Sequence, residues 1–118
     1  MPGIGLNLLQ LEATLASLQP LRRTPAGVPV AACTLAHSSL QMEAGREREV
    51  TVEVQAVALG ELAGVLVVAN PGMQLRVAGF LAAKSLRSRT PILHLNKIEF
   101  LEGNENGFQA QVQVQEKG

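Results

Sequence analysis

Residues 49–58 alternate between apolar and polar side chains, and no other segment restricts the fold as strongly. The apolar side chains occupy every second position: Val50, Val52, Val54, Ala56 and Ala58. Because successive side chains of a β-strand point to opposite faces of its sheet, this period of two predicts a half-buried strand. The rest of the chain therefore has to supply a sheet around this strand.

Four other segments have the apolar character of strands, namely Val28–His37, Met73–Ala83, Ile92–Leu101 and Phe108–Gln115. Strands that recur every twelve to twenty residues, with long loops between them, predict a small barrel rather than a parallel α/β sheet. We expect an all-β chain of one domain, with a five-stranded Greek-key OB-fold barrel and an extra C-terminal strand. Oligonucleotides are the usual ligands of this fold.

Two segments stay ambiguous on periodicity alone. Leu8–Leu18 fits a helical stripe and a strand face equally well, and Leu59–Asn70 fits a short helix or an irregular apolar segment. Gln19–Pro29, with three prolines and a glycine, is interpreted as a loop, and so is Ser38–Arg46. Within Met73–Ala83, Gly79 indicates a bend or a bulge.

Positive charge gathers between Arg76 and Lys97, a stretch with five basic and no acidic residues. Its polar linker, between two apolar runs, carries Lys84, Arg87 and Arg89. A basic loop between two strands suits a polyanion, of which nucleic acid is the commonest. The alternative is a solvated hairpin tip that keeps a sheet edge from aggregating. The ten basic and ten acidic residues cancel, so no overall field draws the chain to DNA or to a membrane.

Several function classes find no support in the residues. Cys33 is the only cysteine, and neither His37 nor His94 has partners at metal-ligand spacing. No set of titratable groups forms an acid–base or nucleophilic arrangement. We therefore expect no enzyme, no metal site and no cofactor. Without an export signal or a run of about 18 apolar residues, we expect a cytoplasmic protein with no membrane span.

Aromatic residues are scarce, with three phenylalanines and neither tryptophan nor tyrosine. Phe80 and Phe100 lie in apolar strands. For Phe80 core packing is favoured over base stacking, and Phe100 is likewise expected in the core. Phe108 begins the extra terminal strand, where it is as well placed for a dimer contact as for any other role. Without exposed aromatics, nucleic acid would be held by phosphate charge and backbone donors. The glutamates around Glu49 are interpreted as a solvated strand face, with DNA repulsion or a basic partner as the alternative.

Three segments taken together resemble one family. They are PLRRTPAGVPVAACTLAHSS, EAGREREVTVEVQAVALG and PGMQLRVAGFLAAKSLRSRTPILHLNKIEFL. In order and spacing they are similar to the primosomal replication protein N family, PriB, which is close to the bacterial single-stranded DNA-binding proteins. The resemblance covers about Leu9–Leu101.

The resemblance implies an OB-fold homodimer that binds single-stranded DNA and helps to restart stalled replication forks. A restart helicase and a primosome loading protein are the implied partners. The resemblance also makes Leu9–Leu18 the first barrel strand and Leu59–Val68 the connection between the third and fourth strands. The domain expectation is a flexible N-terminus over 1–7, the OB-fold over 8–101 and an extension with an extra strand over 102–118.

Carried over residue by residue, the family's basic DNA contacts fall on Arg23, Lys84, Arg87 and Arg89. Arg22 and Arg48 are plausible additions. Two positions depart from the family pattern: Ser38 stands where well-known members carry a basic residue, and Thr51 where they carry tryptophan.

The leading hypothesis is a non-enzymatic single-stranded DNA-binding accessory protein of the replication-restart primosome. It would hold phosphates through its basic loop residues and bridge helicase and loader. One alternative is a protein-interaction adaptor with weak or vestigial DNA binding. The other is a general protein that coats single strands.

Overall fold

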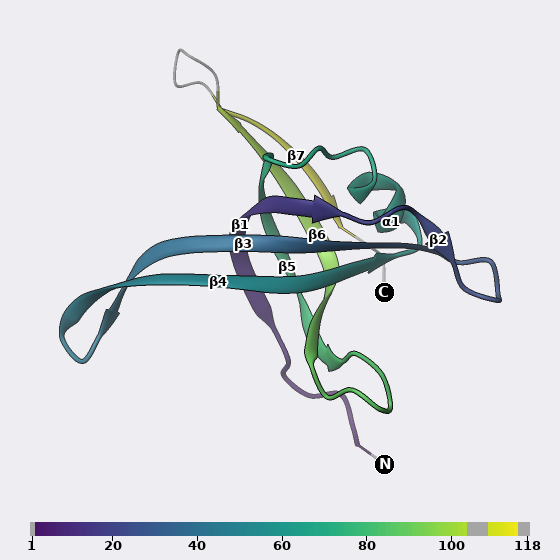
Figure 1. Cartoon of the computed structure of the whole chain (residues 1–118), viewed down its shortest axis with the longest axis horizontal. Helices are drawn as coiled ribbons and strands as arrows, with labels where there is room; N and C mark the ends of the chain where they lie inside the picture. Colours follow the sequence, from purple (N-terminus) through teal and green to yellow (C-terminus); the bar gives the residue numbers. More distant parts are fainter. Residues whose placement is uncertain (1, 104–108, 116–118) are drawn as a thin grey trace.

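The computed structural model describes residues 2–103 and 109–115, with side chains up to Leu101 (Figure 1). Strands dominate this part of the chain, and one short helix interrupts them. The elements are β1 (Leu9–Leu18), β2 (Arg22–Arg23), β3 (Pro29–Glu43), β4 (Arg46–Leu59), α1 (Glu61–Leu66), β5 (Gln74–Ala83), β6 (Pro91–Gly103) and β7 (Gln109–Gln115). No helix among the described residues is long and apolar enough to cross a membrane.

Five strands close into a barrel. β1 pairs with β3 on one side and with β5 on the other, and the ring continues through β6 and β4 back to β3. All of these pairings are antiparallel except the short contact between β4 and β6. The expected OB-fold barrel is thus confirmed, with Leu9–Leu18 as its first strand. β7 pairs with β6 outside the ring and forms the extra C-terminal strand.

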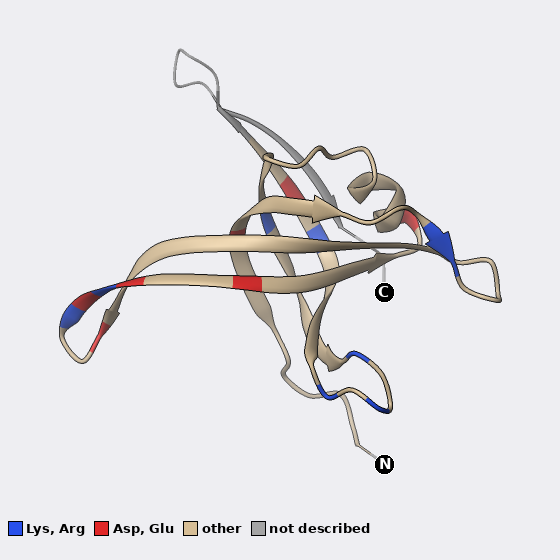
Figure 2. Ribbon diagram, in the orientation of Figure 1, with Lys and Arg blue, Asp and Glu red and all other residues tan. Residues whose placement is uncertain are grey.

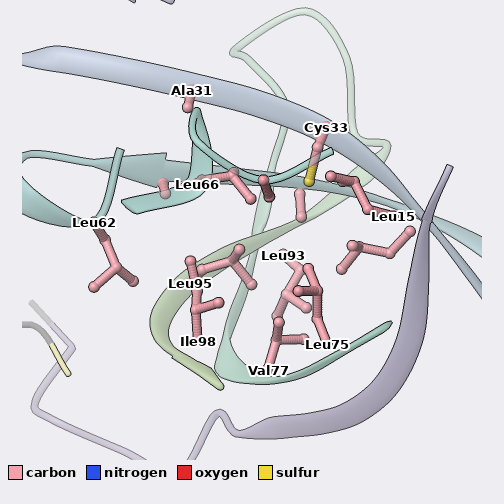
Figure 3. Close-up of a cluster of buried hydrophobic side chains, with 14 of the residues drawn as sticks. Leu15, Ala31, Cys33, Leu62, Leu66, Leu75, Val77, Leu93, Leu95 and Ile98 are labelled. Atoms are coloured by element: carbon pink, nitrogen blue, oxygen red, sulfur yellow. The ribbon is translucent and has the colours of Figure 1, made fainter. Parts of the chain in front are cut away.

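The core lies inside this ring, where leucine and other branched side chains are excluded from solvent (Figure 3). Leu15, Leu35 and Leu93, from three different strands, have no exposed surface. Burial of one such side chain contributes about 1.5–3 kcal/mol. Phe100 is 7% exposed, so its predicted place in the core is confirmed.

The segment between β4 and β5, which the sequence left ambiguous, forms the helix α1. Its buried side chains are Leu62, Ala63 and Leu66, which join the barrel core. Gly60 precedes the helix with a φ of 71°, a left-handed conformation that glycine adopts without steric cost. This turn directs the helix back onto the core.

β3 and β4 form a hairpin much longer than expected. The loop predicted over Ser38–Arg46 is wrong, because cross-strand pairing continues to Glu43 opposite Arg46. Only Ala44 and Gly45 remain in the turn, and both have positive φ, as a two-residue hairpin turn requires. β3 pairs with β1 only as far as Ala36, so the outer half of the hairpin extends beyond the barrel (Figure 1).

The predicted loop Gln19–Pro29 also contains a strand. β2 pairs with the start of β3, with Arg22 opposite Val30 and Arg23 opposite Pro29. Thr24 closes the turn, because its backbone N–H donates to Val28 at 2.9 Å and its Oγ1 accepts from the Val28 N–H at 3.1 Å. The prolines and glycine therefore mark a tight hairpin turn rather than a loose connection.

Candidate nucleic-acid interface

One row of side chains crosses four strands on the outer surface of the barrel. Phe80 of β5 is opposite His94 of β6, His94 is opposite Val57 of β4, and Val57 is opposite Ala32 of β3. Residues that pair across strands share a face of the sheet. None of the four belongs to the buried core, so the row is a surface that a ligand can reach.

Phe80 is exposed on this surface, which contradicts the prediction that it packs in the core. Its side chain is 42% exposed, and its ring stacks on that of His94 with centroids 5.1 Å apart and planes 10° from parallel. The alternation of β5 explains the error. Leu75 and Val77 point inward, so Phe80 falls on the outward set with Gln74 and belongs to the surface.

Gly79 brings β5 and β6 unusually close beneath this stack. The pairing register shifts between Ala78 and Gly79, so the predicted irregularity at this glycine is confirmed. A Cβ added at Gly79 would lie 1.9 Å from the carbonyl oxygen of His94. Only glycine permits this approach, which places Phe80 over His94.

A cleft of about 490 Å³ lies over the same face. Arg22 of β2 lines it from one side, and Lys84, the first residue after β5, lines it from the other, with His94, Ala32 and Val57 also in its lining. These two cations come from distant parts of the sequence and meet in one trough. Positive charge above a neutral floor is the arrangement that holds a phosphate backbone next to its bases.

The loop after β5 carries the remaining basic residues of the linker. Lys84 N–H donates to the carbonyl of Thr90 at 2.9 Å, so the loop closes at its base. Ser85 Oγ accepts from the N–H groups of Arg87 and Ser88, at 3.2 and 3.0 Å. Arg87 and Arg89 are exposed on this folded loop, at the Lys84 side of the cleft, but do not line the cleft itself.

Arg23 lies beside Arg22 but has a different role in the structure. Its guanidinium donates from Nη1 to the carbonyl of Gly27 at 3.0 Å, within the β2–β3 turn. Neighbouring residues of a strand point to opposite faces, and only Arg22 lines the cleft. The sequence ranked Arg23 above Arg22, whereas the geometry brings Arg22 to Lys84.

Arg48 is not brought to the cleft. It lies near the tip of the β3–β4 hairpin, where its Nη1 is 3.4 Å from Oε1 of Glu43. Val57 lies nine positions further along β4, about 30 Å away in an extended strand. Figure 2 shows blue and red segments side by side at the tip of this hairpin, a further red band on β4, and blue at β2 and in the β5–β6 loop.

Arg76 does not line the cleft either, and its charge is paired with two glutamates. Its Nη2 lies 2.7 Å from Oε2 of Glu12, and its Nη1 lies 3.2 Å from Oε2 of Glu99, whose side chain is only 7% exposed. The hydrogen bond to Glu12 and the charge of Glu99 raise the pKa of the Arg76 guanidinium. Arg76 thus neutralises a buried carboxylate on the β1–β5–β6 side of the barrel.

A second, larger hollow of about 810 Å³ lies where β3 diverges from β1. His37 bridges this fork, with Nδ1 2.6 Å from the carbonyl oxygen of Glu12 and Nε2 2.7 Å from Ser39 Oγ. Glu12 and Glu53 line the hollow, and its lining includes no lysine or arginine. Its charge disfavours phosphate, so the smaller cleft is the better candidate for nucleic acid.

Among residues 2–103 and 109–115, no three histidine, cysteine or acidic side chains come together as metal ligands. Cys33 is buried, and burial raises the pKa of its thiol to about 11. The cleft offers the charges of Arg22 and Lys84 and the ring of His94, on which Phe80 stacks beside the cleft. Charge next to an aromatic stack is suited to binding single-stranded nucleic acid.

Fold and cleft together define an OB-fold protein of the single-strand binding class. In agreement, the model of a family described as "Another single-strand binding protein family" matches residues 7–97. Within that class, the curated relatives that match include replication restart proteins PriB. Replication restart protein PriB of Bordetella pertussis is 37% identical over 99 residues, which cover 84% of this chain and 92% of the relative.

PriB of Neisseria meningitidis serogroup B is 39% identical over 97 residues, which cover 82% of this chain and 96% of the relative. A solved structure of the protein PriB from Ralstonia solanacearum is 38% identical, with a TM-score of 0.74 over 81% of this chain and 99% of that one. The chain belongs to the PriB replication restart protein family. The resemblance of the three segments to that family is thereby confirmed.

Proposed function

We propose that this chain binds single-stranded DNA across the cleft between Arg22 and Lys84. The observation that carries the proposal is that these two cations line one trough together with His94, Val57 and Ala32, and that Phe80 stacks on His94 just outside its lining. Arg22 and Lys84 hold phosphates from the two sides. Arg23, Arg87 and Arg89 extend the positive field at either end.

The Phe80–His94 stack supplies the contact to a base. A base stacked on an aromatic ring contributes about 1–3 kcal/mol without regard to its identity. Phe80 is the ring exposed to solvent, and His94 supports it from the side of β6. The chain has threonine at position 51, where well-known members carry tryptophan, so this stack takes over the role of an aromatic platform.

Acidic residues set the far limit of the DNA path. Glu53, Glu49 and Glu47 share the outward face of β4 with Val57, because they are an even number of residues from it along the strand. DNA that continued along the β3–β4 hairpin would meet these carboxylates. The negative end confines the strand to the barrel end of the face.

The outer half of the hairpin suits a protein rather than DNA. Leu40 and Met42 are 65% and 67% exposed, and they pair across the hairpin with Glu49 and Glu47. Apolar side chains bordered by carboxylates fit a basic, amphipathic partner. We assign this surface to the proposed bridging of a restart helicase and a primosome loading protein, which gives a non-enzymatic accessory protein acting in the cytoplasm.

The proposed homodimer uses the open edge of β1. In the described part of the chain, β1 pairs with β5 from Leu9 onward, but its pairing with β3 begins only at Thr14. An unpaired edge of this kind is a template for a second strand, and two copies of β1 can pair around a two-fold axis. A lone species of about 12.5 kDa at micromolar concentration in sedimentation would count against the dimer.

A titration of fluorescein-labelled oligo-dT, followed by anisotropy, tests DNA binding. We expect the triple variant Lys84→Ala, Arg87→Ala and Arg89→Ala to bind at least about tenfold more weakly than wild type, since each cation contributes favourably to binding the phosphate backbone. The matched control is Arg46→Ala with Arg48→Ala at the hairpin tip, which should bind as wild type does. Equal binding by the triple variant and the wild type would remove the proposed site.

A further inference from the structure

His94 lies between the two cations of the cleft. In the order of the sheet, its strand β6 is next to β5, and β4 and β3 separate it from β2. Lys84 follows β5 and Arg22 belongs to β2, so four strand spacings, about 19 Å along the sheet, separate the two charged ends. Among the described residues that line the cleft, His94 is the only one besides these two that can carry a positive charge.

The ring of His94 has a fixed orientation. The ring of Phe80 covers one of its faces, with centroids 5.1 Å apart and planes 10° from parallel. Both ring nitrogens of His37 have hydrogen-bond partners, at 2.6 and 2.7 Å, whereas those of His94 have none among the described residues. His94 is only half-buried and lines the cleft, so its nitrogens can bond to a ligand there.

The charged groups around His94 favour a bound anion. Besides His94, the titratable groups in the cleft lining are Arg22, Lys84 and Cys33. Burial raises the pKa of the Cys33 thiol to about 11, so this group carries no charge near neutral pH. The described acidic side chains of the neighbouring β3, β4 and α1, and of β6 itself, do not line the cleft; they are Glu43, Glu47, Glu49, Glu53, Glu61 and Glu99. A protonated His94 therefore has no carboxylate to pair with in the cleft.

We propose that His94, in its protonated form, is a third contact to the phosphates of single-stranded DNA, so that the affinity of the cleft for DNA rises as the pH falls. The inference rests on the proposed function, because Arg22 and Lys84 hold the same phosphate backbone. An imidazole takes up a proton between about pH 5 and 8 and then donates from both nitrogens. A phosphate in the cleft stabilises this charge, and so does the face of the Phe80 ring.

NMR of the histidine side chains tests this coupling in the wild-type chain. His37 and His94 are the only histidines, so the Hε1 signal of each can be followed from pH 5.5 to 8, with and without saturating oligo-dT. Neither thymine nor the phosphodiester titrates in this range. We expect DNA to raise the midpoint of the His94 titration by about 0.5 to 1 pH unit and to leave that of His37 in place. The signal that is missing in His94→Gln assigns the two. An unchanged midpoint for His94 would overturn the inference.

The affinity at two pH values measures the same coupling from the DNA side. We expect the wild type to bind oligo-dT about three- to tenfold more tightly at pH 5.5 than at pH 8. The slope of log K against log salt should be more negative by about 0.7 at the lower pH. His94→Gln should remove both differences whatever its overall affinity, and the matched control His37→Gln should keep them. The same pH dependence in His94→Gln as in the wild type would contradict a contact from His94.

The inference and the proposed function fail in different ways. If Arg22→Ala with Lys84→Ala weakens binding while His94→Gln keeps the pH dependence, the cleft binds DNA and His94 does not contact it. If the double variant binds as the wild type does, the proposed function fails and the inference fails with it. Circular dichroism checks that each variant retains the barrel.

Discussion

Phe80 and His94 lie ring over ring on the outside of the barrel, with centroids 5.1 Å apart, although each belongs to a strand whose other side faces the core. Their pairing depends on Gly79, which lets the two strands approach below the rings. His94 lines the cleft between Arg22 and Lys84, and Phe80 lies beside it on the same outer face of the barrel. Charge and aromatic surface therefore converge without either tryptophan or tyrosine in the chain.

Substitution of Phe80 should separate binding from folding. We expect Phe80→Leu to weaken oligo-dT binding by about 10- to 100-fold through loss of base stacking. The side chain is 42% exposed, so the unfolding temperature should change little. Phe80→Trp is the matched control and should keep the affinity. Wild-type affinity in Phe80→Leu would mean that no base stacks there.

Gly79→Ala should destabilise the barrel. Its Cβ would lie 1.9 Å from a backbone oxygen that cannot move without separating β5 from β6. We expect a loss of about 1–3 kcal/mol in the free energy of unfolding, measured by urea denaturation. Gly64→Ala in α1 is the contrasting variant, because nothing lies within 4 Å of its added Cβ. It should stabilise the protein by about 0.5–1 kcal/mol, and equal effects of the two changes would contradict the structure.

Arg76→Met should lower the unfolding temperature by a few degrees and leave DNA affinity unchanged. The substitution leaves the Glu99 carboxylate, whose side chain is 7% exposed, without its ion pair. Glu12→Gln should cost much less, because Glu12 is largely exposed. Differential scanning calorimetry and the oligo-dT titration provide the two readouts. A loss of DNA binding in Arg76→Met with intact folding would place Arg76 in the interface.

Cys33 should make stability depend on pH in the alkaline range. Burial raises the pKa of its thiol from 9.0 to about 11, so the unfolded chain loses this proton first as pH rises. The contribution of the protonated thiol to the free energy of unfolding is complete below pH 9. It is lost between pH 9 and 11, by up to about 1.4 kcal/mol per pH unit. Cys33→Ala removes this slope and corrects for other titrating groups. Identical slopes in the two proteins would show that the thiol is not buried.

Local patterns predicted the strands well where one face of a strand is buried. The alternation of residues 49–58 predicted β4, and the resemblance resolved the ambiguous Leu8–Leu18 in favour of β1. The pattern failed between Ser38 and Arg46, where small and polar residues indicated a loop. There the long pairing with β4 down to Glu43 determines the structure, and such pairing depends on the partner strand rather than on local composition.

The candidate site was predictable in part. The basic linker stands out by charge alone, and Lys84 belongs to the cleft. Arg22, rather than Arg23, lines the cleft with Lys84 because of the two-residue strand β2. The prolines and glycine around β2 indicated a loop, so this strand was not predicted. The exposure of Phe80 could have been predicted from the alternation of the strand, because Phe80 lies an even number of positions from the polar Gln74 and an odd number from the apolar Leu75. Its stack on His94 depends on the register between β5 and β6, which no single segment contains.

The salt dependence of oligo-dT binding tests the central claim most directly, namely that cations from two ends of the cleft hold a DNA strand by its phosphates. With about three to six phosphates neutralised, the slope of log K against log salt should be roughly −2 to −4. In Arg22→Ala with Lys84→Ala, the slope should become less negative by about 1.4, or about 0.7 for each contact. A flat response in the wild type, or an unchanged slope in the double variant, would contradict the account.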